Sequence, residues 1–79
     1  MTKAKQKALA IDRIENRIKN MQNVDNLESL EMYDFCIETQ IHLLLQLEII
    51  TEQERYTLEN KQIDAYIAKR DEVKSKYIA

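Results

Sequence analysis

The sequence has no glycine, no proline and no tryptophan, and it contains a single cysteine, Cys36. Folds rich in strands depend on glycine, proline and related residues to reverse the chain, so their absence argues against a strand-rich fold. The chain is instead rich in isoleucine, leucine, lysine, glutamate and glutamine, residues that are common in helices. The composition therefore predicts an all-α protein.

One cysteine excludes an internal disulfide, and we expect Cys36 to be a small core residue. We find no segment with the charged-then-apolar pattern of a secretory signal, so we expect a cytoplasmic protein. The most apolar stretch, residues 41–50, is interrupted by His42, Gln46 and Glu48. Because a membrane-spanning helix needs about 20 apolar residues, we expect no association with a membrane.

The small formal charge of −2 hides a strong segregation of charge along the chain. Residues 1–24 carry six basic and two acidic side chains, whereas residues 25–51 carry six acidic side chains and no lysine or arginine. The remaining residues carry six of each sign. This pattern predicts that a basic first helix lies against an acidic second helix and is partly neutralised there.

Three segments show the apolar spacing of helices, over residues 4–22, 26–49 and 52–77. No linker or repeat interrupts residues 1–79, so we predict one domain, an antiparallel three-helix bundle. A chain of this length is near the limit at which one core offsets the entropy of ordering. The first helix has a seam of Ala4, Ile11, Ile14, Ile18 and Met21, and the third a looser seam of Tyr56, Ile63, Tyr66 or Ile67, Val73 and Tyr77.

The second predicted helix is apolar on two faces, which suggests that it needs covering on two sides. Whatever the other two helices leave uncovered is expected to be a binding surface. One face consists of Leu30, Tyr33, Ile37, Ile41 and Leu44, and the other of Met32, Cys36, Leu43, Leu47 and Ile50. From both faces we select as core or interface residues Ile37, Ile41, Leu44, Leu47 and Ile50.

Two short motifs predict where helices begin. Thr51 and Glu54 have the spacing of a capping box, in which each side chain binds the other residue's backbone N–H. Asp25 and Glu28 have the same spacing at the start of the second helix. The chain is therefore expected to reverse at both places without glycine.

The second of these turns resembles a known family. Leu44, Leu47, Ile49, Ile50, Thr51, Glu52 and Glu54, followed by Lys61, are similar to the helical hairpin of SHOCT-type short C-terminal domains. The resemblance covers residues 42–63, and it departs from the family where Glu48 replaces a glycine and where Tyr56 stands one position late. It implies a small interaction or oligomerisation module, and it implies no catalytic residues.

The sequence gives little support for a catalytic or metal-binding site. Glu38 and His42 are one helical turn apart and could share a proton or a metal, but a single histidine supplies at most half of an ordinary metal site. No glycine is present to build a phosphate-binding loop, and Ser29 and Ser75 stand in predicted helical, solvent-exposed contexts. We therefore predict no enzymatic activity, no metal, no cofactor and no small-molecule substrate.

The sequence favours a protein that acts by binding another protein or a second copy of itself. A polar strip on the second helix is the candidate contact surface for a partner, and it consists of Glu28, Glu31, Asp34, Glu38 and His42. The composition and size suggest a phage or mobile-element protein that binds and modulates or inhibits a host protein. The alternative is a nucleic-acid-binding or regulatory protein that uses Arg13 and Arg17 of the basic first helix, although aromatic residues are absent there.

Overall fold

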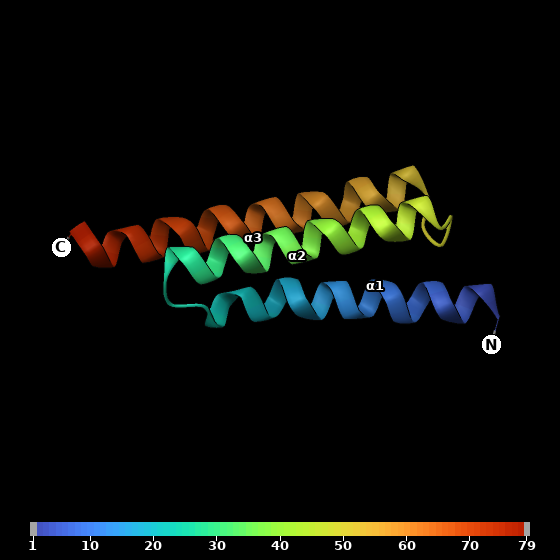
Figure 1. The fold of residues 1–79 in the computed structure, drawn as a ribbon, viewed down its shortest axis with the longest axis horizontal. Coiled ribbons are helices and arrows are strands. Elements are labelled where there is room, and N and C mark those ends of the chain that lie inside the picture. The colour runs from blue at the N-terminus through green and yellow to red at the C-terminus, as the bar shows by residue number, and fades with distance from the viewer. Residues whose placement is uncertain (1, 79) are drawn as a thin grey trace.

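The computed structural model describes residues 2–78, and side chains are described through residue 76. The chain forms α1 (Lys3–Asn20), a short 3-10 turn η1 (Met21–Asn23), α2 (Leu27–Gln46) and α3 (Glu52–Ile78), as Figure 1 shows. Each helix runs antiparallel to the one before it. The predicted all-α, three-helix antiparallel bundle is confirmed.

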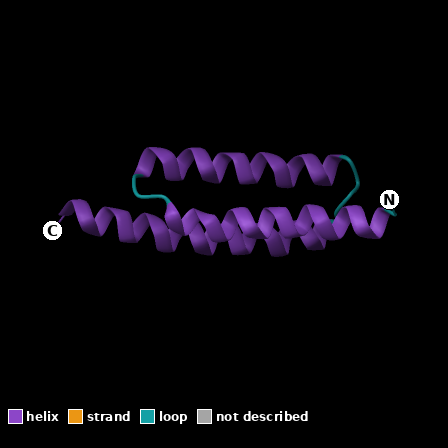
Figure 2. Ribbon diagram, turned by 90° about the horizontal axis from the view of Figure 1, so that it is seen from below, coloured by secondary structure: helices purple, strands orange, loops and turns teal. Residues whose placement is uncertain are grey.

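The three helices do not lie in one layer. In Figure 2, α2 runs alongside α1 and α3 and lies to one side of them, and these two helices overlap in that view. All three pairs of helices are in contact, and the most extensive contact joins α2 and α3. Both α1 and α3 therefore cover the same side of α2, and its opposite side faces outward. The sequence predicted two apolar faces on this helix, and the other two helices cover only one of them.

The core lies along the axis where the three helices meet. Ile37 and Ile41 of α2 are completely buried there, and Ile50 of the following turn is nearly so, as predicted. Leu44 is half-buried against the same cluster. The α1 seam is confirmed at its C-terminal half only, because Ala4 is exposed and Ile11 is half-buried. The buried cluster consists of Ile14, Ile18, Met21, Leu30, Ile37, Ile41, Ile50 and Leu58.

The seam predicted for α3 is wrong at Tyr56 and Ile63, which are exposed, whereas Val73 is buried and Tyr66 is half-buried. The side chain of Tyr77 lies outside the described residues. Two positions of the actual seam hold polar side chains, Gln62 and Lys69, which are 4% and 7% exposed. The spacing of apolar residues does not predict this buried face of α3, because two of its positions hold the amide of Gln62 and the ammonium of Lys69.

Both buried polar side chains connect different helices. The Gln62 amide of α3 donates to the backbone oxygen and the Oδ1 of Asp34 in α2, over 3.2 and 2.9 Å. The Lys69 ammonium donates to the backbone oxygen of Gln22 over 2.6 Å, at the end of the first helical segment. Carbonyl groups at a helix end lack partners within the helix and carry partial negative charge. Lys69 therefore ties α3 to the turn between α1 and α2.

The turn between α2 and α3 begins earlier than predicted, since α2 ends at Gln46 and not at residue 49. Glu48 has a φ of 59°, in the left-handed region. The N–H groups of Glu48 and Ile49 donate to the carbonyls of Leu45 and Leu44, over 3.0 and 2.9 Å. These two bonds form a Schellman motif, which usually has glycine at the left-handed position. The helix ends here because the backbone reverses its hand at Glu48.

Glu48→Gly is expected to stabilise the protein. A residue with a Cβ atom pays about 1 kcal/mol in the left-handed region, and glycine does not. We therefore expect the free energy of unfolding to rise by about 1 kcal/mol, which for a domain of this size raises Tm by about 4–8 °C. Chemical and thermal denaturation would measure the change. Glu48→Ala is the matched control, because it removes the same carboxylate and keeps the Cβ; a gain of equal size there would contradict the explanation.

The start of α3 has the predicted capping box. The backbone N–H of Thr51 donates to Glu54 Oε1 over 2.8 Å, and the N–H of Glu54 donates to Thr51 Oγ1 over 3.2 Å. The box predicted for Asp25 and Glu28 is wrong. Asn26 caps α2 instead, and its side chain accepts from the N–H of Ser29 over 2.8 Å. The extended backbone of Asn26 puts its side-chain oxygen in reach of the first turn.

The carboxylate of Glu54, at the start of α3, also contacts α1. The hydrogen bond from the Thr51 backbone lowers the pKa of Glu54, and Lys7 of α1, whose Nζ lies 3.1 Å from Glu54 Oε1, lowers it further. A carboxyl whose pKa is lower in the folded state stabilises the fold above its unfolded pKa. This contribution is lost as the pH falls through the lowered, folded-state pKa.

As the pH falls through the folded-state pKa of Glu54, the free energy of unfolding is therefore expected to decrease more for the wild-type protein than for Glu54→Gln. The glutamine can still accept the Thr51 N–H but carries no charge, so its contribution should not change with pH. Urea denaturation midpoints measured from neutral to acidic pH would test this. In Lys7→Ala the urea midpoint should change with pH by an intermediate amount, because the ammonium of Lys7 is removed and the hydrogen bond from Thr51 remains. The same pH dependence of the urea midpoint in wild type and Glu54→Gln would contradict the prediction.

Candidate interaction surface

The outward side of α2 carries a stripe of exposed apolar side chains. Phe35 and Met32 are 68% and 65% exposed, the largest values among the large apolar side chains described. Cys36 is also exposed, so the prediction that it fills the core is wrong. Leu47, predicted as core or interface, is exposed and so contributes nothing to the core. We call these residues the outer stripe: Met32, Phe35, Cys36, Leu43 and Leu47.

The reason for this exposure is the position of α2 in the bundle. Helices α1 and α3 both pack on the face that includes Ile37 and Ile41. Residues half a turn away, such as Cys36 and Leu43, therefore point away from both neighbours. The sequence pattern identifies these residues as apolar, but it does not tell which of the two apolar faces is covered.

The acidic strip predicted on α2 lies along the edge next to α3. Asp34 accepts from Gln62, and Glu31 accepts a hydrogen bond from the Tyr66 hydroxyl, which raises the pKa of Tyr66. Glu28 lies exposed in the first turn of α2. The strip therefore borders α3, where neutral side chains donate hydrogen bonds to it, and not the basic α1, which corrects the expectation drawn from the charge segregation.

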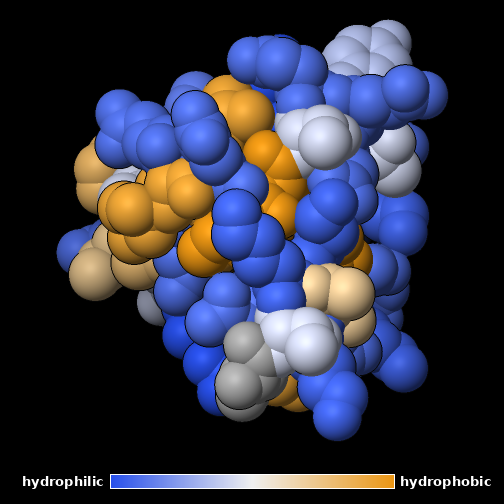
Figure 3. Space-filling view, turned by 90° about the vertical axis from the view of Figure 1, so that its right-hand side faces the viewer, coloured by the Kyte–Doolittle hydropathy of each residue, from blue (hydrophilic) through white to orange (hydrophobic). Residues whose placement is uncertain are grey.

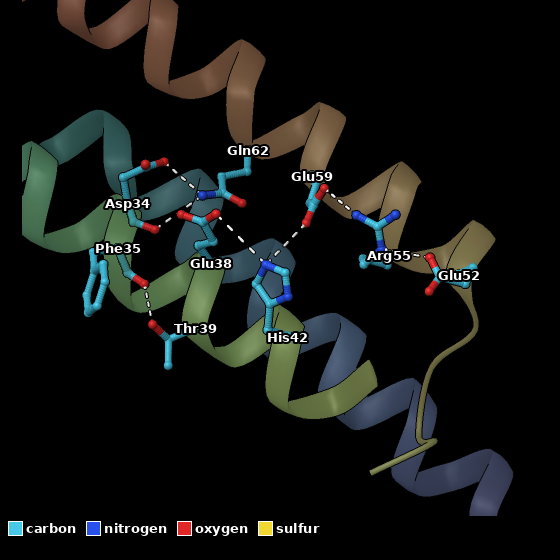
Figure 4. Close-up of polar contacts among 9 residues, drawn as sticks. All are labelled: Asp34, Phe35, Glu38, Thr39, His42, Glu52, Arg55, Glu59 and Gln62. Carbon is cyan, nitrogen blue, oxygen red and sulfur yellow. Dashed lines mark hydrogen bonds and ion pairs between the residues drawn. The ribbon is translucent and has the colours of Figure 1, made fainter. Parts of the chain in front are cut away.

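His42 lies between two carboxylates. Its Nε2 is 3.9 Å from Glu38 Oε1 on the same helix and 3.8 Å from Glu59 Oε1 on α3. Glu59 also pairs with Arg55 Nη1 over 2.7 Å. Figure 4 shows Glu38 and His42 pointing from α2 toward α3, whereas Phe35 points away from it. These polar residues form the border between the outer stripe and α3.

The described residues, 2–78, hold no group of three or more histidine, cysteine, aspartate or glutamate side chains arranged to bind a metal ion. The predicted pairing of Glu38 with His42 is present, at a distance longer than a hydrogen bond. Both side chains are about half exposed, so they are solvated groups at the edge of a surface. Over the same residues, no helix is long and apolar enough to cross a membrane.

The other edge of the outer stripe is basic. Arg13 and Arg17 of α1 are exposed and line a shallow groove together with Gln40, Leu43 and Leu44 of α2. No ion pair of either arginine is found among the described side chains. The ion pairs of α1 lie elsewhere, since Lys7 contacts Glu54 of α3 and Glu15 accepts from Lys61 of α3. The outer stripe thus has an acidic border on one side and a basic border on the other.

A second exposed apolar region lies at the end of the bundle where α1 begins. Figure 3 views this end and shows hydrophobic side chains gathered on one part of a mostly hydrophilic surface. An open groove of about 480 Å³ is lined there by Lys3 and Lys7 of α1 and by residues 47–51 of the turn. Leu47 belongs to both this groove and the outer stripe, so the two apolar surfaces are continuous.

Comparison with known proteins finds no matching family model, no matching curated protein and no matching solved structure. The resemblance of residues 42–63 to the SHOCT-type hairpin therefore stays a prediction. The left-handed Glu48 does stand where that pattern has glycine. Evidence for function must come from the surface of the bundle itself.

Proposed function

We propose that this protein is a non-enzymatic protein–protein interaction module and that the outer stripe of α2 is its binding surface. The observation that carries the proposal is the alignment of Met32, Phe35 and Leu43 on the outward face of α2, with Leu47 at its C-terminal cap, each more than half exposed. Single exposed apolar residues are normal on protein surfaces, whereas grouped ones mark interaction sites.

The energetic argument compares exposed and buried side chains. Transfer of one large aliphatic or aromatic side chain from water to an apolar contact is worth roughly 1.5–3 kcal/mol. Four such side chains on one surface could therefore supply much of the binding energy of a small interface. Aromatic residues and methionine are enriched in the centres of interfaces, and Phe35 and Met32 are of these types. The acidic and basic borders would orient the partner.

In this proposal the acidic strip has a secondary role. Asp34 and Glu31 are already bonded to α3, so among the strip residues Glu38, His42 and Glu28 remain for a partner. Charges at the rim of an interface affect orientation and association rate more than affinity. A host protein bound and modulated by a phage or mobile-element product would be one such partner, and the chemistry it requires is an apolar surface with charges at its edge.

A comparison of surface variants in a pull-down would test the proposal. The tagged wild-type chain should retain a defined protein, and Phe35→Asp and Leu43→Asp should each lose it while circular dichroism shows an unchanged helix content. Leu9→Asp and Ile67→Asp are matched controls, because they place the same charge at exposed apolar positions on α1 and α3. Equal retention by the stripe variants and the controls would contradict the assignment of the surface.

Nucleic-acid binding is a second candidate because Arg13 and Arg17 are exposed neighbours on one side of α1. Phosphate contacts require such basic groups, and their affinity falls steeply as salt rises. The candidate predicts a gel shift of DNA or RNA at low salt that is lost in Arg13→Ala/Arg17→Ala. Absence of a shift at low salt would remove it.

A further inference from the structure

We propose that the partner of the outer stripe is a second copy of this chain, in a two-fold dimer whose α2 helices pack side by side in parallel. This inference rests on the proposed function and adds the identity and orientation of the partner. Three observations carry it: the spacing of residues along the stripe, the opposite charges at its two edges, and the small size of the domain.

The spacing is that of a coiled-coil seam. Met32, Cys36, Thr39 and Leu43 follow one another by four, three and four residues, and all four are exposed on α2. Residues at this spacing form the contact line between two supercoiled helices. In a parallel pair, each seam residue lies beside its own copy, whereas an antiparallel pair joins different positions. Helices α1 and α3 support α2 from behind, so the seam belongs to an already ordered helix.

The charges decide between the two orientations. Glu38 shares a shallow surface depression with Phe35 and Leu43 on the edge toward α3. Arg13 and Arg17 share another with Leu43 on the edge toward α1. A two-fold axis parallel to α2 brings the acidic edge of each copy to the basic edge of the other, on both flanks. In an antiparallel pair the two-fold axis is perpendicular to α2. The acidic edges of the two copies then meet on one flank and the basic edges on the other, which disfavours this pair.

The positions along the helix agree with this pairing. Arg13 and Arg17 lie level with Gln40 and Leu43 of α2, because all four line the same groove. Glu38 is half a turn from Gln40 on the same helix, and about 3 Å away along its axis. In the parallel dimer, Glu38 of one copy therefore stands close to the level of Arg17 in the other. Domains of this size commonly gain stability by oligomerisation, and the dimer would cover the apolar surface that a monomer leaves in water.

Disulfide cross-linking of purified protein tests both the dimer and its orientation. Wild-type protein should elute with the mass of two chains in light scattering, and copper-phenanthroline should join its Cys36 thiols between chains. In a Cys36→Ser background, Met32→Cys and Leu43→Cys should each cross-link to their own copies as well. Disulfides form only where Cα atoms are within about 7 Å, and positions 32 and 43 are about 16 Å apart along the helix. An antiparallel dimer can therefore self-cross-link at no more than one of positions 32 and 43.

An interface variant provides an independent measurement. Leu43→Asp should raise the dimer dissociation constant by at least about 100-fold, as expected for a charge placed at the centre of an apolar interface. Ile67→Asp, on α3, is the control and should leave the constant unchanged. A monomeric wild type without cross-links overturns the dimer, and self-cross-linking at only one of positions 32 and 43 overturns the parallel orientation.

The two proposals can fail separately. A monomeric chain that retains a different protein, and loses it in Leu43→Asp, overturns the dimer and leaves the proposed function intact. A dimer that is unaffected by Leu43→Asp, with a pull-down that is also unaffected, overturns both, because the outer stripe then has no role in binding.

Discussion

Ile37→Ala is expected to lower the free energy of unfolding by about 2–5 kcal/mol, the range observed when a large buried aliphatic is truncated. Ile37 is 0% exposed and lies in the cluster where all three helices meet. Removal of its outer carbons loses their burial and leaves a cavity that three packed helices close only in part. Because a small domain has a total stability of about 5–15 kcal/mol, this variant should be partly unfolded at moderate temperature.

Urea denaturation followed by circular dichroism would measure the effect. Ile37→Val removes one carbon and should cost only about 0.5–1.5 kcal/mol, which keeps the measurement possible if the alanine variant does not fold. Met32→Ala on the same helix is the matched control, because its side chain is 65% exposed and should change stability little in the monomer. If Met32→Ala costs as much as Ile37→Ala in the monomer, the assignment of the two faces of α2 is wrong.

Gln62→Glu is expected to cost about 3 kcal/mol at neutral pH, the second largest effect. Gln62 is 4% exposed, and its amide nitrogen donates to Asp34 Oδ1 over 2.9 Å. The glutamate has almost the same shape, but it removes the donor and places a second carboxylate against Asp34. Two carboxylates at such a distance cannot both stay ionised without a large penalty.

The cost of Gln62→Glu should shrink as the pH is lowered, because a proton shared between the two carboxyl groups restores a hydrogen bond. Urea midpoints at neutral and acidic pH would show this dependence. The double variant Asp34→Asn/Gln62→Glu should recover most of the stability at neutral pH, because the new amide at position 34 can donate to the new carboxylate. A cost that does not change with pH, or no recovery in the double variant, would contradict the role of the Gln62–Asp34 contact.

Much of the bundle could be predicted from particular residues. The Thr51–Glu54 capping box is a local signal, because its donors and acceptors are three residues apart, and it is present as predicted. The burial of Ile37, Ile41 and Ile50 follows from their size and spacing. Local signals also misled, since Asn26 and not Asp25 caps α2, and either side chain can perform that role.

The candidate surface could be predicted only in part. The residues of the outer stripe were identified as apolar, and Arg13 and Arg17 as basic neighbours. That Gln62 and Lys69 would be buried could not be predicted, because their partners, Asp34 and Gln22, lie on other helices. A polar residue at a buried position becomes favourable only when a distant group satisfies its hydrogen bonds.

By itself, the sequence determined that the chain is helical, where its turns lie and which residues of α2 are apolar, because these properties depend on composition and on neighbours within one or two helical turns. Only the tertiary structure decided that α1 and α3 both pack on the same side of α2. It also decided that the acidic strip borders α3 and that the basic pair Arg13 and Arg17 borders the outer stripe. The physical reason is that an apolar face needs a cover, but its chemistry does not specify which helix supplies that cover. The packing of the other helices therefore determines which face is core and which remains open to a partner.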